Sequence, residues 1–295
     1  KSVKVNASSS YDIFIDENIL DGSGGIIKKI HSPCKILIVT DSNVRRLYYE
    51  TVCKSLSREG FSVYEYVIDA GEHSKSFSVA GKILNFLAEN NFTRSDIAAA
   101  LGGGVVGDIT GFCSAVYLRG IKFIQIPTTF LAAIDSSVGG KTGVNLEAGK
   151  NLAGAFHQPS AVITDCSVFS SLSEEIFAQG VAEAVKYGVI KDEKLFLDLK
   201  TGAPDWKDIV FRCVSIKRDV VERDEFDNGE RQLLNFGHTI GHAVEKRSNY
   251  GITHGEAVAM GMVAAAKIAY SEGISVKDYS EEIAVVLKMY GLPVS

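Results

Sequence analysis

Short apolar runs alternate with amphipathic segments through the first half of the chain. Strand-like runs cover residues 35–40, 61–68, 97–101 and 123–126, and apolar residues at helical spacing cover 42–60, 78–89 and 106–117. This alternation predicts a Rossmann-like α/β domain, with a mainly parallel sheet and helices on both faces. Ligands of such sheets bind beyond the carboxyl ends of the strands, where Asp41 and the segments 71–75 and 102–107 lie.

Strand patterns end near Thr164, and helical spacing then dominates. The predicted helices cover residues 174–191, 206–224, 233–246, 255–272 and 281–290, with turn sequences at 202–204 and 227–230. We therefore expect two domains: an α/β domain at 1–170 and an all-α domain at 171–295.

The segment 231–242 (RQLLNFGHTIGH) carries an unusual polar face. At helical spacing, Arg231, Asn235, His238 and His242 share one side, opposite apolar residues. Two histidines four residues apart can place imidazole nitrogens on one side of a helix as metal ligands. We interpret this face as the wall of a site; the alternative is a surface helix with two uninvolved histidines.

A glycine loop lies between a predicted strand and a predicted helix. In residues 101–108 (LGGGVVGD), Gly102, Gly104 and Gly107 fit the GxGxxG pattern, and this context suits a pyrophosphate at a helix N-terminus. The acidic residue that usually follows and binds the ribose is missing, so Asp41 or Glu72 would have to hold the adenosine. The alternative is a glycine-rich turn needed only for packing.

The segment 127–145 is rich in small and hydroxyl residues. It has too few large apolar groups for a core and too few charges for a typical solvent loop, so we expect it to line a cleft. A flexible Gly/Ser loop is the alternative.

Two charged residues interrupt apolar helical stripes. Glu183 and Lys217 both fall where core residues are expected, so each needs a partner, a metal or an anion. A structural salt bridge or a snorkelling side chain would also explain either one. With His254 and one histidine of the 238/242 pair, Glu183 would complete the ligand set of a catalytic zinc site; spacing alone does not decide which histidine binds.

Composition excludes several classes of protein. The net charge is -5, and the absence of a Lys/Arg cluster argues against nucleic-acid binding. The five cysteines include no CxxC pair, which indicates reduced thiols. No apolar leader and no apolar run of membrane-spanning length is present, so we expect a cytoplasmic protein.

Taken together, the motifs resemble those of the 3-dehydroquinate synthase family. They are GExxK at 71–75, GGGVVGD at 102–108, IPTT at 126–129, DSSVGGKTGVN at 135–145, KN at 150–151, QGVAEAVKYG at 179–188, RQLLNFGHTIGHAVE at 231–245 and HGEAVAMGM at 254–262. The resemblance implies an N-terminal NAD-binding α/β domain, a C-terminal helical metal-binding domain and a homodimer. It also implies conversion of 3-deoxy-arabino-heptulosonate 7-phosphate to 3-dehydroquinate and phosphate, in the shikimate route to aromatic amino acids, with NAD and zinc or cobalt.

The same resemblance assigns residues to each task. The metal ligands would be Glu183, His238 and His254, which leaves His242 to face the substrate. NAD would be held by Asp41, Asn43, Glu72, Lys75, Gly104, Val105, Val106, Gly107, Asp108, Thr128, Thr129, Lys141, Lys150, Val168, Phe169, Ser170 and Ser171. Substrate contacts would come from Asp135, Lys141, Asn151, Lys186, Lys217, Arg231, Asn235 and His242, with Arg119 reaching across a dimer.

The chain departs from the family pattern in two places. The family's Thr-Leu-Pro is here Ser171, Leu172 and Ser173, and family members continue beyond the Gly-Leu-Pro near Ser295 with a segment that carries another substrate-binding lysine. The alternatives are a metal-dependent NAD polyol dehydrogenase, another sugar phosphate cyclase whose substrate lacks a carboxylate, or a nucleotide-binding protein without catalytic activity. Arg231 favours a substrate that carries a carboxylate.

Overall fold

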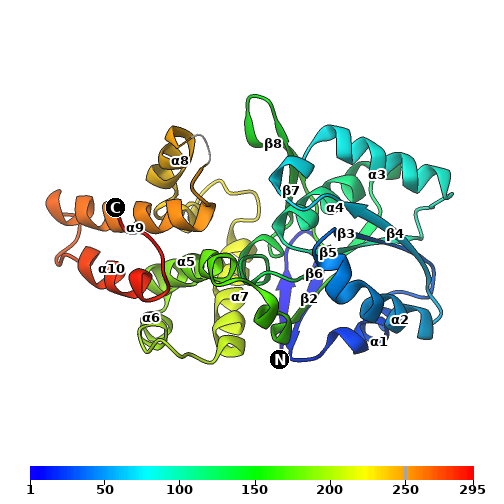
Figure 1. Cartoon of the computed structure of the whole chain (residues 1–295), viewed down its shortest axis with the longest axis horizontal. Helices are drawn as coiled ribbons and strands as arrows, with labels where there is room; N and C mark the ends of the chain where they lie inside the picture. Colours follow the sequence, from blue (N-terminus) through cyan, green and yellow to red (C-terminus); the bar gives the residue numbers. More distant parts are fainter. Residues whose placement is uncertain (249–250) are drawn as a thin grey trace. The chain divides into compact units, whose positions relative to one another are not determined.

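Seven strands of the first unit form one sheet (Figure 1). The computed structural model describes residues 1–248 and 251–295, and the chain divides into two units, Lys1–Ser170 and Ser171–Ser295. Strand order is β1-β2-β9-β6-β5-β3-β4; β1 and β2 pair antiparallel and the other neighbours pair parallel. The bounds are β1 Ser2–Asn6, β2 Ser10–Asp16, β3 Lys35–Asp41, β4 Ser62–Ile68, β5 Ile97–Gly102, β6 Lys122–Pro127 and β9 Ala161–Asp165. The predicted mainly parallel α/β fold is confirmed.

Helices cover both faces of this sheet. On one face, Leu37 and Val39 of β3 and Ala98 and Ala100 of β5 pack against α3 and α4. The alternate residues of β3, such as Ile36, are also fully buried, as expected for a strand inside a doubly covered sheet. Figure 1 shows α1 and α2 on the side opposite α3 and α4. The four helices are α1 Ser23–Lys28, α2 Glu50–Arg58, α3 Phe77–Glu89 and α4 Gly104–Val116.

The strand order reverses between β3 and β5. The chain runs outward from β3 to β4 and then returns to β5 on the other side of β3. Thr40 pairs with Leu101, so Asp41 and Gly102 follow at the same carboxyl edge of the sheet. Such a switch point is where open parallel sheets bind ligands. The glycine loop and Asp41 therefore lie where a nucleotide is expected.

A two-stranded hairpin and several short turns complete the first unit. The hairpin, β7 Lys141–Leu146 and β8 Gly149–Phe156, was not predicted. The segment 127–145 was wrongly expected to contribute no core: Phe130 and Ile134 are fully buried, and Phe130 packs edge-on against Phe169 at 5.5 Å. The short helices are Leu20–Gly22, Glu72–Ser74, Tyr117–Arg119 and Cys166–Ser171, with π-turns at Arg45–Tyr49 and Ala132–Ser136.

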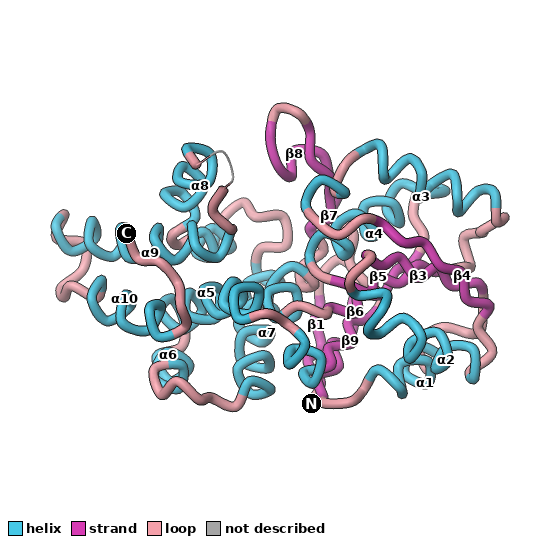
Figure 2. The backbone as a smooth tube through the Cα atoms, in the orientation of Figure 1, coloured by secondary structure: helices cyan, strands magenta, loops and turns pink. Residues whose placement is uncertain are grey.

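Helices make up the second unit, as predicted, and the strands in Figure 2 all belong to the first. Their bounds are α5 Glu174–Lys191, α6 Glu193–Leu199, α7 Trp206–Arg223, α8 His238–Arg247, α9 His254–Ser271 and α10 Ser280–Met289, with a 3-10 turn at Glu230–Asn235. Asp205 caps α7 by accepting hydrogen bonds from the N–H groups of Lys207 and Asp208. Within the described residues, none of the helices combines the length and the apolar character needed to cross a bilayer.

The predicted single helix across 233–246 is wrong. Residues up to Asn235 form the 3-10 turn, and α8 begins only at His238. Gly237 separates the two at φ 82°, a left-handed conformation that glycine adopts without steric cost. Arg231 and Asn235 therefore do not share a helical face with His238 and His242.

Candidate functional site

Three helices of the second unit bring one carboxylate and two imidazoles together. Glu183 lies on α5, and its side chain is only 1% exposed. Its Oε1 is 3.6 Å from Nε2 of His238, the first residue of α8, and 3.5 Å from Nε2 of His254, the first residue of α9. Ligand atoms that surround a zinc ion tetrahedrally at 2.0–2.1 Å lie about 3.4 Å from one another. The three residues therefore fit a divalent ion in donor type and in spacing.

Close backbone packing places these three residues. A Cβ on Gly255 would lie 2.4 Å from Cα of Gln179, so α9 contacts α5 one residue after His254 and one turn before Glu183. A Cβ on Gly261 would lie 1.9 Å from the carbonyl oxygen of Gly237, the residue before His238. Only glycine permits either approach. The sequence thus fixes the spacing of the ligands through small residues beside them.

The N-terminus of α9 is also fixed by side-chain capping. The Thr253 hydroxyl accepts from the N–H of Glu256, and the Glu256 carboxylate accepts from the N–H of Thr253 at 2.8 Å. This reciprocal pair is a capping box, which satisfies donors that the first helical turn leaves without intrahelical partners. His254 consequently has a defined place at the first position of the helix.

The histidines differ in protonation. Burial lowers the pKa of His238 to about 4, so its ring is neutral near pH 7 and can act as a ligand. Burial also opposes the charged form of His254, but the carboxylates of Glu183 and Glu245 outweigh it and raise its pKa to about 9. The cluster therefore favours a positive charge beside Glu183, which either a proton on His254 or a metal ion supplies.

The structure distinguishes between the two histidines of α8. His238 faces Glu183, whereas the side chain of His242 is 61% exposed and lies 4.0 Å from Oε2 of Glu245. His242, Glu245 and His254 form a second group whose ligand atoms lie close enough for an ion. Because its contacts are longer and one member is exposed, the second group is the weaker candidate for a metal site, and the Glu183 group is the stronger one.

Sequence reasoning missed Glu245. It is a buried acidic residue, and it shares the inner side of α8 with Gly241. The sequence contained a signal for it: Glu245 follows Gly241 by four residues, which places both on the same side of a helix, and a glycine there indicates close packing against another helix.

The other candidate residues of the second unit are mostly buried cations. Lys186 pairs with Glu183 inside the unit, and Lys217 is buried on α7 as predicted. The guanidinium of Arg231 is buried too and donates to the carbonyl of Glu225. Asn235 is exposed. A buried cation needs an anionic or polar partner inside the fold, as Lys186 has in Glu183.

In the first unit, the glycine loop leads directly into α4. Gly102 ends β5, and α4 begins at Gly104. A Cβ on Gly102 would lie 2.5 Å from the side chain of Val106, and one on Gly107 would lie 2.7 Å from Oε1 of Gln125. Close packing thus accounts for Gly102 and Gly107. A Cβ on Gly104 would meet the side chain of Ser136, with Oγ at 3.2 Å. Without that Cβ, the N-terminus of α4 can accept an anion.

A polar network joins the predicted NAD-binding and substrate-binding residues of this unit. The Lys75 ammonium donates to Asp108 on α4 and to Asn151 on β8. Asn145 donates to Oε1 of Glu72 at 2.7 Å and accepts from the N–H of Asn151 at 2.9 Å. The structure thus brings Glu72, Lys75, Asp108 and Asn151 together.

The remaining candidates of the first unit lie on turns and strand ends. Oδ1 of Asp41 accepts from the N–H groups of Asn43 and Val44, at 2.8 and 3.0 Å. Thr128 is buried at the end of β6, and Oγ1 of Thr129 accepts from the N–H of Ala132. The others differ in burial. The exposed ones are Lys141, Lys150, Arg119 and Ser170, the partly buried ones are Asp135 and Val105, and the buried ones are Val106, Val168 and Phe169. Ser171, the first residue of the second unit, is exposed.

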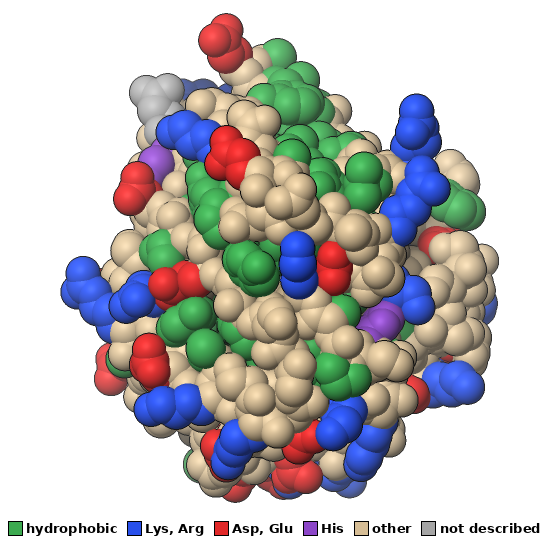
Figure 3. All heavy atoms as spheres, turned by 90° about the vertical axis from the view of Figure 1, so that its right-hand side faces the viewer, with side chains coloured by type: hydrophobic (Ala, Val, Ile, Leu, Met, Phe, Trp, Pro, Cys, Tyr) green, Lys and Arg blue, Asp and Glu red, His purple; other side chains and the backbone are tan. Residues whose placement is uncertain are grey.

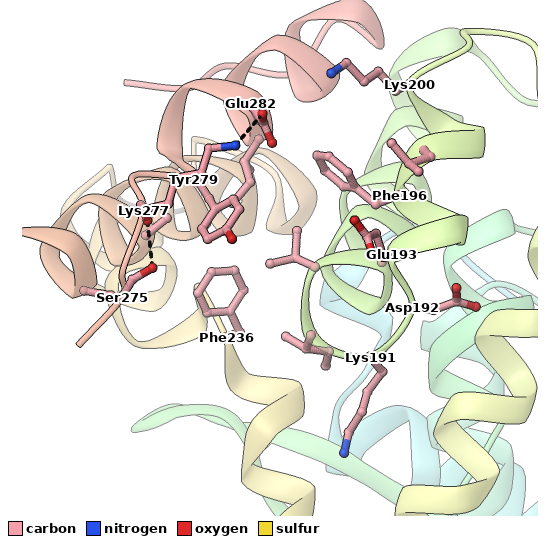
Figure 4. A pocket seen from close by; sticks show the side chains of 17 residues that line it. Lys191, Asp192, Glu193, Phe196, Lys200, Phe236, Ser275, Lys277, Tyr279 and Glu282 are labelled. Atoms are coloured by element: carbon pink, nitrogen blue, oxygen red, sulfur yellow. Dashed lines mark hydrogen bonds and ion pairs between the residues drawn. The ribbon is translucent and has the colours of Figure 1, made fainter. Parts of the chain in front are cut away.

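A separate cavity of about 800 Å³ lies in the second unit, and Figure 4 shows its lining. None of the candidate residues lines it. Two of its lysines are already paired with carboxylates: Lys191 with Glu230 at 3.0 Å and Lys277 with Glu282 at 2.9 Å. Its size alone assigns it no ligand.

Charged side chains of both signs are interspersed on the face drawn in Figure 3, without a continuous basic stripe among its described residues. This distribution agrees with the net charge of -5 and offers no surface for nucleic acid on that face.

Two family models cover most of the chain. The model described as 3-dehydroquinate synthase N-terminal matches residues 65–179, and the model described as 3-dehydroquinate synthase C-terminal matches residues 180–295. The chain belongs to the 3-dehydroquinate synthase family. The resemblance drawn from the motifs is therefore confirmed.

Curated members of the 3-dehydroquinate synthase family are similar over nearly the full chain. The protein of Clostridium botulinum is 45% identical over 291 residues, which span 96% of this chain and 83% of the relative. The protein of Clostridium acetobutylicum is 46% identical over 296 residues, which span 97% of this chain and 82% of the relative. Both are 3-dehydroquinate synthases.

Solved structures of related cyclases share the fold. A 2-deoxy-scyllo-inosose synthase complexed with carbaglucose-6-phosphate, NAD+ and Co2+ matches with a TM-score of 0.91 and 28% identity, covering 100% of this chain and 83% of that one. The 2-epi-5-epi-valiolone synthase of Streptomyces hygroscopicus, with NAD+ and Zn2+ bound, matches with a TM-score of 0.89 and 27% identity, covering 99% and 84%. An iron-containing alcohol dehydrogenase, at 18% identity and a TM-score of 0.68, shares the fold alone.

Proposed function

We propose that this chain converts 3-deoxy-arabino-heptulosonate 7-phosphate to 3-dehydroquinate and phosphate, using NAD and a divalent metal. The observation that carries the proposal is the cluster of Glu183, His238 and His254, with contacts of 3.5 and 3.6 Å, in a chain whose two halves match one family. The related cyclases that share the fold contain NAD+ with Co2+ or Zn2+. The ion here is zinc or cobalt, which suits imidazole and carboxylate ligands.

The chemistry requires no net oxidant. When bound, NAD supplies a hydride acceptor and the divalent ion supplies a Lewis acid for a substrate hydroxyl. With both groups bound, oxidation of that hydroxyl would acidify the neighbouring C–H, phosphate would leave by elimination, and return of the hydride would leave NAD unchanged overall. Ring opening and an aldol closure then give the product. The residues of the chain must therefore hold a phosphorylated, carboxylated sugar in one orientation throughout.

Each group of candidate residues has a part in that task. The N-terminus of α4, from Gly104 to Asp108, binds the pyrophosphate of NAD, and Glu72 and Lys75 border it. Arg231 binds the substrate carboxylate with Lys217, since a planar guanidinium matches a carboxylate in bidentate geometry, and its contact with the Glu225 carbonyl orients it. Each unit has its own candidates for contacts to the rest of the substrate. They are Asp135, Lys141 and Asn151 in the first unit and Lys186, Asn235 and His242 in the second.

A substitution at Gly104 tests the nucleotide site. Gly104→Val places a branched side chain at the first residue of α4, where the pyrophosphate must approach the backbone. We expect the dissociation constant for NAD, measured by isothermal titration calorimetry, to rise at least tenfold. The added Cβ lies 3.2 Å from the Ser136 hydroxyl, so the melting temperature of the NAD-free variant is measured as well, to separate loss of the nucleotide site from loss of the fold. Unchanged NAD affinity would remove α4 from the proposed site.

The chain is further proposed to act as a cytoplasmic homodimer, with Arg119 contributing to the site of a second copy. Leu118 and Arg119 lie at φ 49° and 67°, a conformation that costs free energy in residues other than glycine and is concentrated at functional positions. Arg119 is also exposed. Light scattering should give a mass twice the 31.8 kDa of one chain, and a monomer would refute this part of the proposal.

Product analysis separates this activity from the alternatives. Incubation with the heptulosonate phosphate, NAD and zinc should release phosphate and form dehydroquinate with no lasting rise in absorbance at 340 nm. A polyol dehydrogenase, the activity suggested only by the shared fold, would accumulate NADH instead. A cyclase that needs no carboxylate would also accept a phosphorylated sugar that lacks one.

A further inference from the structure

Glu245 is a buried carboxylate that no step of the proposed reaction uses. Its side chain is only 6% exposed and lies near the end of α8. A carboxylate in such a place is costly unless it is paired with a cation or a hydrogen-bond donor. The groups beside the Glu245 carboxylate, His254 and His242, therefore indicate its role.

Glu245 contacts a metal-ligand histidine through the nitrogen that does not face the metal centre. Its Oε1 is 3.8 Å from Nδ1 of His254, while Nε2 of the same ring is 3.5 Å from Oε1 of Glu183. The ring thus lies between two carboxylates, one at each nitrogen. If Nδ1 carries the hydrogen and donates it to Glu245, the lone pair is left on Nε2, toward Glu183 and His238.

Helix packing fixes this arrangement. His238, His242 and Glu245 follow one another at i, i+4 and i+7 along one side of α8. A Cβ on Gly241, between them, would lie 2.9 Å from the carbonyl oxygen of Ala257, so this side of α8 lies directly against the first turns of α9. The carboxylate of Glu245 consequently reaches His254 across the contact between the two helices.

We propose that Glu245 is the positioning residue of the metal centre, holding His254 in the orientation and tautomer in which Nε2 binds the ion. The inference rests on the proposed metal site. Metal-binding histidines commonly donate their second ring N–H to a carboxylate, which orients the ring and strengthens the ligand. Oε2 of Glu245 lies 4.0 Å from Nε2 of His242, so the same residue joins the metal centre to a histidine proposed to contact the substrate.

Glu245→Gln tests the inference, since it keeps the size of the side chain and removes its charge. The dissociation constant for Zn²⁺ alone, measured by competition with a chromophoric chelator, should rise about 10- to 100-fold. The visible spectrum of the Co²⁺-loaded protein should change as well, since an unsupported ring alters the ligand geometry. A purely structural role would lower the melting temperature of metal-free protein without either change.

Glu256→Gln is the matched control. It makes the same chemical change two residues from His254, and glutamine still forms a capping box with Thr253. Its Zn²⁺ affinity should stay within about threefold of the unsubstituted protein. Equal loss of affinity in both variants would assign the effect to net charge or to loosening of α9, and would overturn the inference.

A measurement on the unsubstituted protein keeps the inference testable if Glu245→Gln fails to fold. Long-range ¹⁵N–¹H correlation spectra of the zinc-loaded protein should show His254 protonated at Nδ1 and bound to metal through Nε2. Metal on Nδ1 would refute the role of Glu245. Absence of Zn²⁺ binding by the unsubstituted protein would instead refute the metal site itself, so the two failures are distinct.

Discussion

His238→Ala is expected to lose bound metal and turnover together. Its Nε2 is one of the three potential ligand atoms of the group formed by Glu183, His238 and His254, and lies 3.6 Å from Oε1 of Glu183. His242, also on α8, belongs to the second group instead. Removal of a direct ligand should weaken binding by more than the roughly 10- to 100-fold that loss of a supporting hydrogen bond costs. Metal content after dialysis, measured by mass spectrometry, and phosphate release under saturating NAD are the two measurements.

His242→Ala is the matched control on the same helix. His242 is largely exposed and faces Glu245, so its loss leaves the Glu183 group intact. We expect nearly full metal content with turnover reduced about 10- to 100-fold, as for loss of a hydrogen bond to a charged phosphate. Should His238→Ala retain metal while His242→Ala loses it, the metal centre would be the group of His242, Glu245 and His254 instead.

Gly261→Ala is expected to destabilise the helical unit and to weaken metal binding as well. The added Cβ would lie 1.9 Å from the carbonyl oxygen of Gly237 and 2.9 Å from the N–H nitrogen of Gly241, both backbone atoms of the α8 segment. The two helices must move apart, and overpacking of this kind costs about 1–3 kcal/mol or more in the free energy of unfolding. His238 follows Gly237 directly, so its distance from Glu183 should increase.

The same substitution at Gly81 provides the control. Gly81 lies inside α3, and a Cβ there meets nothing within 4 Å. Alanine in an open helix interior is stabilising relative to glycine by about 0.5–1 kcal/mol. Chemical denaturation should therefore give opposite signs for the two variants. A neutral or stabilising Gly261→Ala would show that close packing of α8 on α9 does not set the metal site.

Much of the fold could be predicted from local sequence pattern, because buried strands give short apolar runs and amphipathic helices repeat apolar residues at helical spacing. The runs at 97–101 and 123–126 became β5 and β6, and 174–191 matched α5 residue for residue. The strands β1 and β2 were missed even though their burial alternates, as at Val3 and Val5. A pattern only a few residues long, interrupted by serines, is too short to be distinguished from a coil.

The site was less predictable, since tertiary contacts decide it. Periodicity treated 231–242 as one helix, but Gly237 breaks it before His238, so Arg231 and Asn235 do not share a helical face with the histidines. Tertiary contacts then place His238 beside Glu183 and leave His242 exposed near Glu245. The hairpin contacts of Asn145 with Glu72 and of Asn151 with Lys75 likewise join segments far apart in the sequence. The resemblance to a family gave the ligand set; the geometry supplies its physical reason and adds Glu245.

Anomalous diffraction at the zinc absorption edge, from crystals of the zinc-loaded protein, tests the account most directly. It should locate one ion at about 2.0–2.2 Å from Oε1 of Glu183 and from Nε2 of both His238 and His254, with room left for a substrate hydroxyl. An ion bound by His242 and Glu245, or none near Glu183, would contradict the account.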